Sequence, residues 1–389
     1  MAIRPSGVWK SWRLRCLVDD PALRGLPTGA VVTGAAAARD RGVNRTAYVG
    51  LFTILLLGLV LFIGVSVSLG QVDVPLRDTF RILAGKLFGV SGGEIQGTYV
   101  NVIWHIRFPR ALLACVVGAG LSMCGTAMQA AVQNPLADPY ILGVSSGASL
   151  GATFAILIGW GATGLLARTG VAFWAFAGAF GASMLVMTLA GMGGKPSSAK
   201  LVLAGMIINA LCGAITNFIV YTANNAQGIR SVAFWSMGSL ATANWKILPP
   251  VAIVTLLSIT FFLTQTRILN TMLLGDEAAV TLGVSLTFYR RLYLLVSALA
   301  TGILVSSCGT IGFVGLIVPH IVRGAVGSDH KRLLPLAILC GALFLVCADI
   351  FARTIVAGSE LPIGIITALV GAPLFMYMVV RRGYGFGGQ

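Results

Sequence analysis

The sequence predicts an all-α polytopic membrane protein with about ten transmembrane helices per protomer. Hydrophobic residues make up 57% of the 389 residues and charged residues only 10%, whereas a soluble domain carries about 25% charged residues. The mean hydropathy is +0.90. The net charge is +15, but the charged residues lie mostly between apolar runs. This pattern indicates membrane topology and contact with anionic lipid rather than binding to nucleic acid.

Composition divides the chain into three regions. Residues 1–46 are basic and rich in Ala, Gly and Arg, and we expect them to form a disordered cytoplasmic tail. Residues 47–382 form the predicted ten-helix membrane domain, and residues 383–389 a short C-terminal tail. An even number of spans places both termini on one side of the membrane. Lys and Arg are in excess on that side, mainly because of the basic tail, which favours cytoplasmic termini.

The apolar runs predict the spans in order, because about 20 apolar residues are needed to cross a hydrocarbon core of about 30 Å. A short amphipathic helix is predicted over 76–88, between the first two spans. The interval 291–323 is long enough for two spans, which meet near Gly309. The predicted spans are 47–69, 110–132, 140–158, 171–192, 201–221, 247–265, the two within 291–323, 333–356 and 364–380.

The stretch Q-N-P-L-A-D-P-Y-I-L-G-V-S-S-G (133–147) predicts a tight reversal at a membrane surface. Its two prolines end the arriving helix, and each follows an Asn or Asp in an arrangement that opens turns. Glycines then recur at i, i+4 and i+8, a pattern that lets another helix backbone approach closely in a membrane. The predicted packing glycines are Gly143, Gly147 and Gly151.

Two predicted spans carry polar residues on one helical face. These residues either hydrogen-bond neighbouring helices or line a water-filled path, and the sequence leaves both alternatives open. Asn134 and Leu136, in the reversal between the second and third spans, are added to these polar residues. The candidate path or gate residues are Ser122, Thr126, Gln129, Gln133, Asn134, Leu136, Asn209 and Thr216.

The sequence shows no catalytic or metal-binding constellation. Gly193-Gly194-Lys195-Pro196 lacks the first glycine of a phosphate-binding loop and has proline where Ser or Thr would coordinate magnesium. The cysteines form no C-x-x-C pair and the histidines are scattered. We therefore expect no ATPase site, no metal site and no cofactor in this chain.

An ion-coupled secondary transporter is an alternative class, but such carriers usually bury several titratable groups as relays. Here only Asp349 lies well inside an apolar run, four residues before Arg353, with which it can pair. A non-transporting membrane scaffold is a second alternative.

Several motifs resemble, in order, those of the permeases of ABC importers for iron-siderophores, haem and vitamin B12, the type II importers. They are R-F-P-R (107–110), N-P-L-A-D-P with L-G-V-S-S-G, G-D-E-A-A-V-T-L-G (275–283), G-L-I-V-P-H-I-V-R, A-D-I-F-A-R and E-L-P-I-G-I-I-T-A-L-V-G-A-P-L-F. The resemblance covers roughly 47–382.

The resemblance implies a homodimer in the inner membrane, with the substrate path along its two-fold axis. Two ATPase subunits, which bind ATP and magnesium, would attach inside, and a periplasmic or extracellular substrate-binding protein would dock outside. A ferric siderophore is the favoured substrate, followed by haem and vitamin B12.

The resemblance also assigns residues to the two partners. The ATPase would contact a coupling segment; without the resemblance, the same stretch would be interpreted as a surface connector. The residues of the coupling segment are Gly275, Asp276, Glu277, Ala278, Ala279, Leu282 and Gly283. The binding protein would dock through arginines, whose planar fork holds a carboxylate bidentately; the alternative for these is snorkelling or an internal pair. They are Arg107, Arg110 and Arg353.

Overall fold

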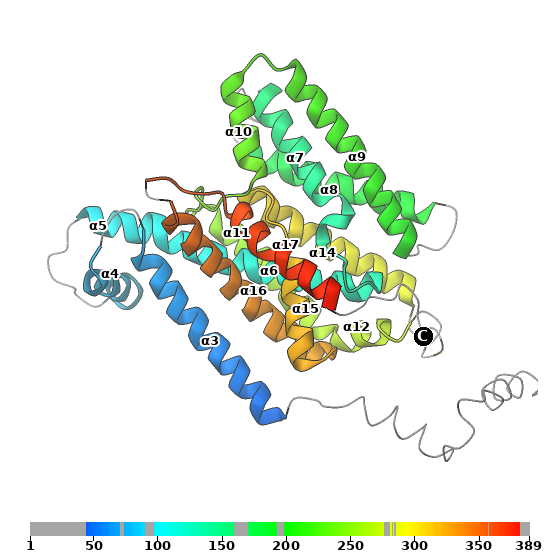
Figure 1. Cartoon of the computed structure of the whole chain (residues 1–389), viewed down its shortest axis with the longest axis horizontal. Coiled ribbons are helices and arrows are strands. Elements are labelled where there is room, and N and C mark those ends of the chain that lie inside the picture. Colours follow the sequence, from blue (N-terminus) through cyan, green and yellow to red (C-terminus); the bar gives the residue numbers. More distant parts are fainter. Residues whose placement is uncertain are drawn as a thin grey trace, which may run out of the picture. The chain divides into compact units, whose positions relative to one another are not determined.

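The computed structural model describes residues 44–70, 74–89, 97–158, 170–192, 198–275, 281, 283, 285–356 and 358–381. Residues from Arg45 onward form one compact unit (Figure 1). The predicted basic tail lies outside the described residues except for 44–46, and the predicted C-terminal tail lies wholly outside them. The first helix begins at Arg45, two residues inside the predicted tail.

Every regular element among the described residues is helical, which confirms the all-α prediction. Short π-helical or 3₁₀ turns occur over Val102–Arg107, Pro139–Leu142 and Phe154–Ile158. The α-helices are α3 (Arg45–Ser68), α4 (Leu76–Phe88), α5 (Gly97–Asn101), α6 (Phe108–Val132), α7 (Val144–Thr153), α8 (Gly170–Gly191), α9 (Ser198–Thr222), α10 (Ala226–Ser236), α11 (Leu248–Thr264), α12 (Thr266–Met272), α14 (Leu286–Cys308), α15 (Val314–Val326), α16 (His330–Thr354) and α17 (Ile363–Arg381).

The helices have the lengths and composition of a polytopic membrane protein. Within the described residues, six are long and apolar enough to cross a membrane: α3, the continuous helix Gly97–Val132, α8, α9, α14 and α16. α11 and α12 reach this length and composition only as a pair, and the helix axis bends by 65° between them, as in a broken span or a re-entrant loop. Three shorter apolar helices cover Val144–Ile158, Val314–Val326 and Ile363–Met378. The set agrees with about ten spans, a number that is approximate because the last three are shorter than a full crossing.

Helix α10 was not predicted; it lies between the predicted spans 201–221 and 247–265. It is an amphipathic helix that starts at an Asn N-cap: the Asn225 side chain accepts a hydrogen bond from the Gly228 N–H at 2.9 Å. The chain breaks near Gly309 as predicted, although the second helix, α15, is shorter than a full crossing. α14 ends at Cys308, and Gly309 (φ 72°) and Phe313 (φ 69°) then turn the chain into α15.

Helix α6 is the centre of the unit. Most of its residues are buried, and it packs against α16, α14, α15 and α11 (Figure 1). Glycine makes this packing possible. A Cβ atom on Gly118 would lie 2.2 Å from the carbonyl oxygen of Gly341 on α16, and one on Gly125 only 1.8 Å from that of Gly315 on α15.

Two of the predicted packing glycines lie where α7 meets α8. A Cβ atom on Gly147 would lie 2.3 Å from the Gly178 carbonyl oxygen, and one on Gly151 would lie 1.9 Å from that of Trp174. α7, α8 and α9 pack against one another, and α10 contacts α7 (Figure 1). Glycine at these two positions therefore sets the distance between α7 and α8.

Gly143 differs from its two neighbours in the pattern. Its φ is 75°, and it ends the 3₁₀ turn Pro139–Leu142 and precedes α7. The prediction placed all three glycines on one helix, which is wrong for Gly143 because the chain first completes a separate turn after Pro139. Glycine is favoured at position 143 because it adopts the left-handed backbone conformation without the steric cost of a Cβ atom.

We expect Gly147→Leu to disrupt the α7–α8 contact, since a branched side chain would have to enter space occupied by the α8 backbone. Overpacking of a core costs about 1–3 kcal/mol where side chains can adjust, and backbone adjusts less. The measurement is the monodisperse yield and the thermal midpoint of the detergent-purified protein. Gly181→Leu on α8 is the control, because a Cβ atom there meets nothing within 4 Å. Equal behaviour of the two variants would contradict the prediction.

Candidate functional site

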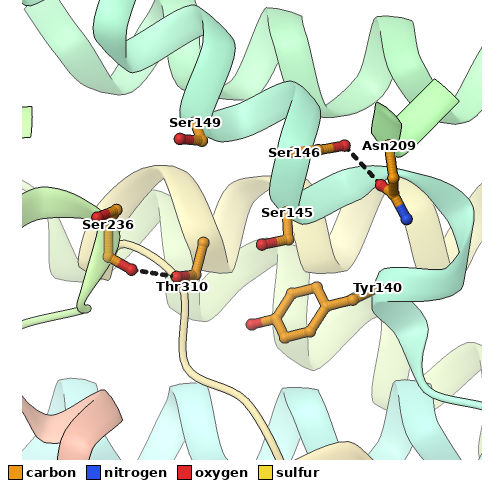
Figure 2. Close-up of a pocket in the computed structure, with 7 residues that line it drawn as sticks. All are labelled: Tyr140, Ser145, Ser146, Ser149, Asn209, Ser236 and Thr310. Carbon is orange, nitrogen blue, oxygen red and sulfur yellow. Dashed lines mark hydrogen bonds between the residues drawn. The ribbon is translucent and has the colours of Figure 1, made fainter. Parts of the chain in front are cut away.

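A polar pocket of about 280 Å³ lies where α7, α9 and α10 meet the connection between α14 and α15 (Figure 2). α7 supplies three serines at positions 145, 146 and 149, and two of these stand four residues apart on one helical face. The lining residues are Tyr140, Ser145, Ser146, Ser149, Asn209, Ser236 and Thr310.

Hydrogen bonds hold the walls of the polar pocket together. The Ser146 hydroxyl donates to Oδ1 of Asn209 at 2.6 Å, which joins α7 to α9 (Figure 2). The Thr310 hydroxyl donates to the carbonyl oxygen of Ser236, which joins the α14–α15 connection to α10. The Tyr140 hydroxyl donates to the Ile311 carbonyl oxygen at 2.9 Å and accepts from the Ile311 N–H at 3.1 Å.

The chemistry of this lining is that of uncharged donors and acceptors. Hydroxyl groups and one amide offer hydrogen bonds in several directions, and none of the described residues that line the pocket carries a carboxylate, ammonium or guanidinium group. Such a surface can exchange hydrogen bonds with a polar solute without holding it by opposite charge. The arrangement suits passage better than catalysis.

A larger groove of about 1060 Å³, lined by residues of α8, α10, α11 and α14, is mainly apolar. Aromatic side chains on α8 and α10, including Phe173, Phe176 and Trp235, contribute to it, and Glu360 lies at its edge. Apolar surface is ordinary where helices face lipid. The polar pocket is the better candidate site, because polar groups from distant segments converge there.

The predicted path residues fall into different places. Asn209 lines the polar pocket. Ser122, Thr126 and Gln129 are buried in α6, with exposed fractions of 0%, 0% and 2%. The Ser122 hydroxyl donates to the Ala337 carbonyl oxygen at 2.7 Å, and the Gln129 amide donates to that of Leu316 at 3.2 Å. Ser122 and Gln129 therefore make the interhelical hydrogen bonds of the first alternative. A role of this stripe in a path stays a prediction.

The remaining predicted path residues do not line the polar pocket. Thr216 donates its hydroxyl hydrogen bond to the Cys212 carbonyl oxygen within α9. Leu136 is half-buried in the reversal after α6, and its N–H donates to Oδ1 of Asn134 at 2.9 Å. A role for these residues in a path stays a prediction.

The reversal after α6 is internally hydrogen-bonded. Gln133 ends α6 with φ 54°, and its side-chain amide donates to the Met272 carbonyl oxygen at 2.8 Å. Asp138 Oδ1 accepts from the Tyr140 N–H at 2.8 Å. Desolvation raises the pKa of Asp138 to about 6, and the Tyr140 N–H partly offsets that rise. The reversal thus connects α6 directly to a wall of the polar pocket.

The three predicted docking arginines lie close together, where the C-terminal ends of α3 and α16 meet the N-terminal end of α6. Arg107, Arg110 and Arg353 are 5%, 6% and 6% exposed. Arg110 pairs through Nε with Asp349 at 2.9 Å and through Nη1 with Glu360 at 2.7 Å. We call Arg107, Arg110, Arg353, Asp349 and Glu360 the arginine cluster.

Further contacts bind the arginine cluster to the C-terminal end of α3. Arg353 Nη2 lies 3.0 Å from the second oxygen of Asp349, an ion pair by distance without hydrogen-bond geometry. Arg353 also donates to the carbonyl oxygens of Ser66 and Leu69. Arg107 donates to the Ser68 carbonyl oxygen at 2.7 Å. Cations are favoured at a helix C-terminus by the helix dipole.

The internal pair of Arg353 with Asp349 is therefore present. The docking role of the three arginines stays a prediction, because each is almost fully buried in the described unit. Glu360, whose side chain is 37% exposed, is the member of the arginine cluster that solvent reaches best.

Most of the predicted coupling segment lies outside the described residues, namely Asp276, Glu277, Ala278, Ala279 and Leu282. The glycines at its two ends are described, and both have positive φ, 95° at Gly275 and 77° at Gly283. Glycine adopts this conformation without the steric cost of a Cβ atom.

Sequence reasoning found only Asn209 among the residues of the polar pocket. The spacing S-S-G-A-S on α7 is a signal for Ser145 and Ser149, which share a helical face. Ser236 and Thr310 carried no such signal, because they lie at the end of an unpredicted helix and in a connection. Only the fold brings them together.

Comparison with known proteins finds the same architecture elsewhere. The model of the FecCD transport family matches residues 55–381. The chain is 40% identical over 333 residues to the hemin transport system permease protein HmuU of Yersinia pestis, covering 84% of this chain and 96% of that protein. It is 42% identical over 328 residues to the cobalamin import system permease protein BtuC of Halobacterium salinarum, covering 82% and 85%. The solved structure of an inward-facing metal-chelate type ABC transporter matches with a TM-score of 0.73 at 33% identity, covering 85% of this chain and 99% of that one.

Proposed function

Because the chain belongs to the FecCD transport family and is a permease subunit of an ABC importer, we propose that it carries a metal chelate across the inner membrane, with a ferric siderophore as the favoured substrate. The polar pocket is the observation that carries this proposal. Its uncharged lining of hydroxyl groups and the Asn209 amide suits a bulky polar solute that must be released again. A path with strong opposite charges would instead retain it.

Haem is the second candidate substrate. The similarity to a hemin transport permease over nearly its whole length favours it. Vitamin B12 is a third, supported by the similarity to a cobalamin import permease. Identities of this size are compatible with different substrates in one family, so transport must decide among the three.

The proposed assembly is a homodimer whose two polar pockets flank a path along the two-fold axis. Two ATPase subunits would bind ATP and magnesium and attach to the coupling segment, Gly275–Gly283. A substrate-binding protein would dock at the opposite end of the helices, where the arginine cluster lies. In the proposed arrangement both termini would lie in the cytoplasm.

Transport by purified components tests the proposed function. Proteoliposomes would contain the permease with its ATPase, and each assay would add one binding protein loaded with labelled ferric siderophore, haem or cobalamin. We expect ATP-dependent accumulation of the ferric siderophore and no ATP hydrolysis by the permease alone.

Accumulation of haem alone would replace the siderophore by the second candidate. If the complex hydrolyses ATP in response to a loaded binding protein but accumulates none of the three, the chelate proposal is wrong. Robust hydrolysis by the permease without its partner would contradict the assignment of ATP hydrolysis to a separate subunit.

A further inference from the structure

Two hydrogen bonds attach the C-terminal end of α6 to the helices that flank the coupling segment. Before the segment, the carbonyl oxygen of Met272, the last residue of α12, accepts from the Gln133 side-chain amide at 2.8 Å. After it, Nε of Arg290 on α14 donates to the Ala131 carbonyl oxygen at 2.8 Å. The helices before and after the coupling segment, α12 and α14, are therefore both hydrogen-bonded to the C-terminal end of α6.

The Arg290 contact is favoured by its surroundings. Arg290 is 3% exposed, and its guanidinium lies at the end of α6 where the helix dipole favours a cation. A hydrogen bond from a charged donor is stronger than one between neutral groups. Loss of this bond would leave a buried charge with fewer acceptors, so α14 cannot shift easily without moving α6.

The Gln133 contact is made by a residue with an unusual backbone. A φ of 54° is uncommon for a residue other than glycine, and here it lets the Gln133 N–H bond to the Ala130 carbonyl oxygen while the side chain reaches Met272. Met272 is fully buried. The end of α12 is thus tied to the residue at which the chain leaves α6.

From Gln133 a short hydrogen-bonded reversal leads to the polar pocket. Asn134 and Asp138 each accept a backbone N–H two residues ahead, and prolines at positions 135 and 139 restrict the backbone. The reversal ends at Tyr140, whose hydroxyl bonds to both backbone groups of Ile311 beside the polar pocket. Because few backbone torsions of the reversal are free to rotate, a displacement of the α6 end would also displace Tyr140 in the pocket wall.

We propose that Arg290 and Gln133 are positioning residues that transmit movement of α12 and α14 to the polar pocket through the end of α6. The inference rests on the proposed function, in which the ATPase subunit contacts the coupling segment. Closure or opening of the ATPase dimer would displace α12 and α14 together. The two hydrogen bonds would convert that displacement into movement of Tyr140.

The test compares Gln133→Ala and Arg290→Gln with a matched control, Ser198→Ala. The Ser198 hydroxyl donates to the Val132 carbonyl oxygen, so the control loses a contact at the same helix end that comes from α9 rather than from the flanks. Each variant is assembled with its ATPase and reconstituted. The measurements are ATPase co-purification, ATP hydrolysis with loaded binding protein, and substrate transported per ATP hydrolysed.

We call Gln133→Ala and Arg290→Gln the flank variants, because each removes a hydrogen bond between α6 and a helix that flanks the coupling segment. We expect both to retain the ATPase subunits and to hydrolyse ATP. The amount of substrate transported per ATP should fall at least about fivefold, the lower end of typical coupling between sites. Ser198→Ala should keep the wild-type ratio. Gln133 is exposed, so Gln133→Ala should fold even if Arg290→Gln does not.

An unchanged ratio in Gln133→Ala, an equal fall in Ser198→Ala, or loss of the ATPase from the flank variants would each overturn the inference. The wild-type complex reports separately on the proposed function. If wild type neither hydrolyses ATP with a loaded binding protein nor transports, the proposed function fails and the inference with it. If wild type is coupled and both flank variants are equally coupled, only the inference fails.

Discussion

Asp349→Ala is expected to destabilise the protein more than any other single change in the arginine cluster. Asp349 is fully buried and lies within 3.0 Å of both Arg110 and Arg353. Its removal would leave two nearly buried guanidinium groups without their shared carboxylate. Removing one partner of a buried ion pair typically costs about 3–5 kcal/mol. The measurement is the thermal midpoint and the folded yield of the detergent-purified protein.

Glu360→Gln is the matched control for this prediction. It also removes a carboxylate paired with Arg110, but the Glu360 side chain is 37% exposed. Solvent at Glu360 screens this ion pair, and Arg110 keeps its pair with Asp349, so the loss should be smaller than for Asp349→Ala. Equal destabilisation by the two changes would show that burial does not decide the value of these pairs.

The sequence predicted most helices because charges and prolines separate its apolar runs. The amphipathic helix expected over 76–88 is α4, with the same bounds. The meeting point near Gly309 was predictable since glycine and proline interrupt an uncharged interval. Helix α10 was missed because it is short and half polar, so only its Asn225 cap marked it.

Helical periodicity alone could not decide the role of the polar stripe on α6. The spacing correctly puts Ser122, Thr126 and Gln129 on one face, but it does not say what that face meets. α6 is surrounded by other helices, so each of its faces is a packing face. Ser122 donates to the Ala337 carbonyl oxygen of α16, whereas Thr126 on the same face donates to the Ser122 carbonyl oxygen of its own helix.

The polar pocket was hard to predict for a different reason. Its walls come from a turn, the helices α7 and α9, the end of α10 and a connection. Sequence spacing relates residues within one helix, such as Ser145 and Ser149. It contains no signal that relates Ser236 to Thr310, which meet only because α10 packs beside the α14–α15 connection.

The largest effect of adding one methyl group is expected for Gly125→Ala. A Cβ atom at this position would lie 1.8 Å from the carbonyl oxygen of Gly315, 2.5 Å from its carbonyl carbon and 2.6 Å from its Cα. All three are backbone atoms of α15, so no side chain can rotate away. α6 and α15 would have to separate, and the hydrogen bond from Arg323 on α15 to Gln129 on α6 at 2.8 Å would be strained. Extra methylene groups in a packed core cost about 1–3 kcal/mol even where side chains can adjust, and we expect at least the upper end of that range.

The control for this prediction has the opposite expected sign. Gly50 lies in α3, and a Cβ atom there meets nothing within 4 Å. Glycine in a helix interior is about 1 kcal/mol less favourable than alanine, so Gly50→Ala should leave the thermal midpoint unchanged or raise it. Gly125→Ala carries the same propensity gain and should nevertheless lower the midpoint, because contact with the α15 backbone outweighs it. If both variants raised the midpoint, α6 and α15 would not be in the close contact described here, and the central position of α6 would have to be reconsidered.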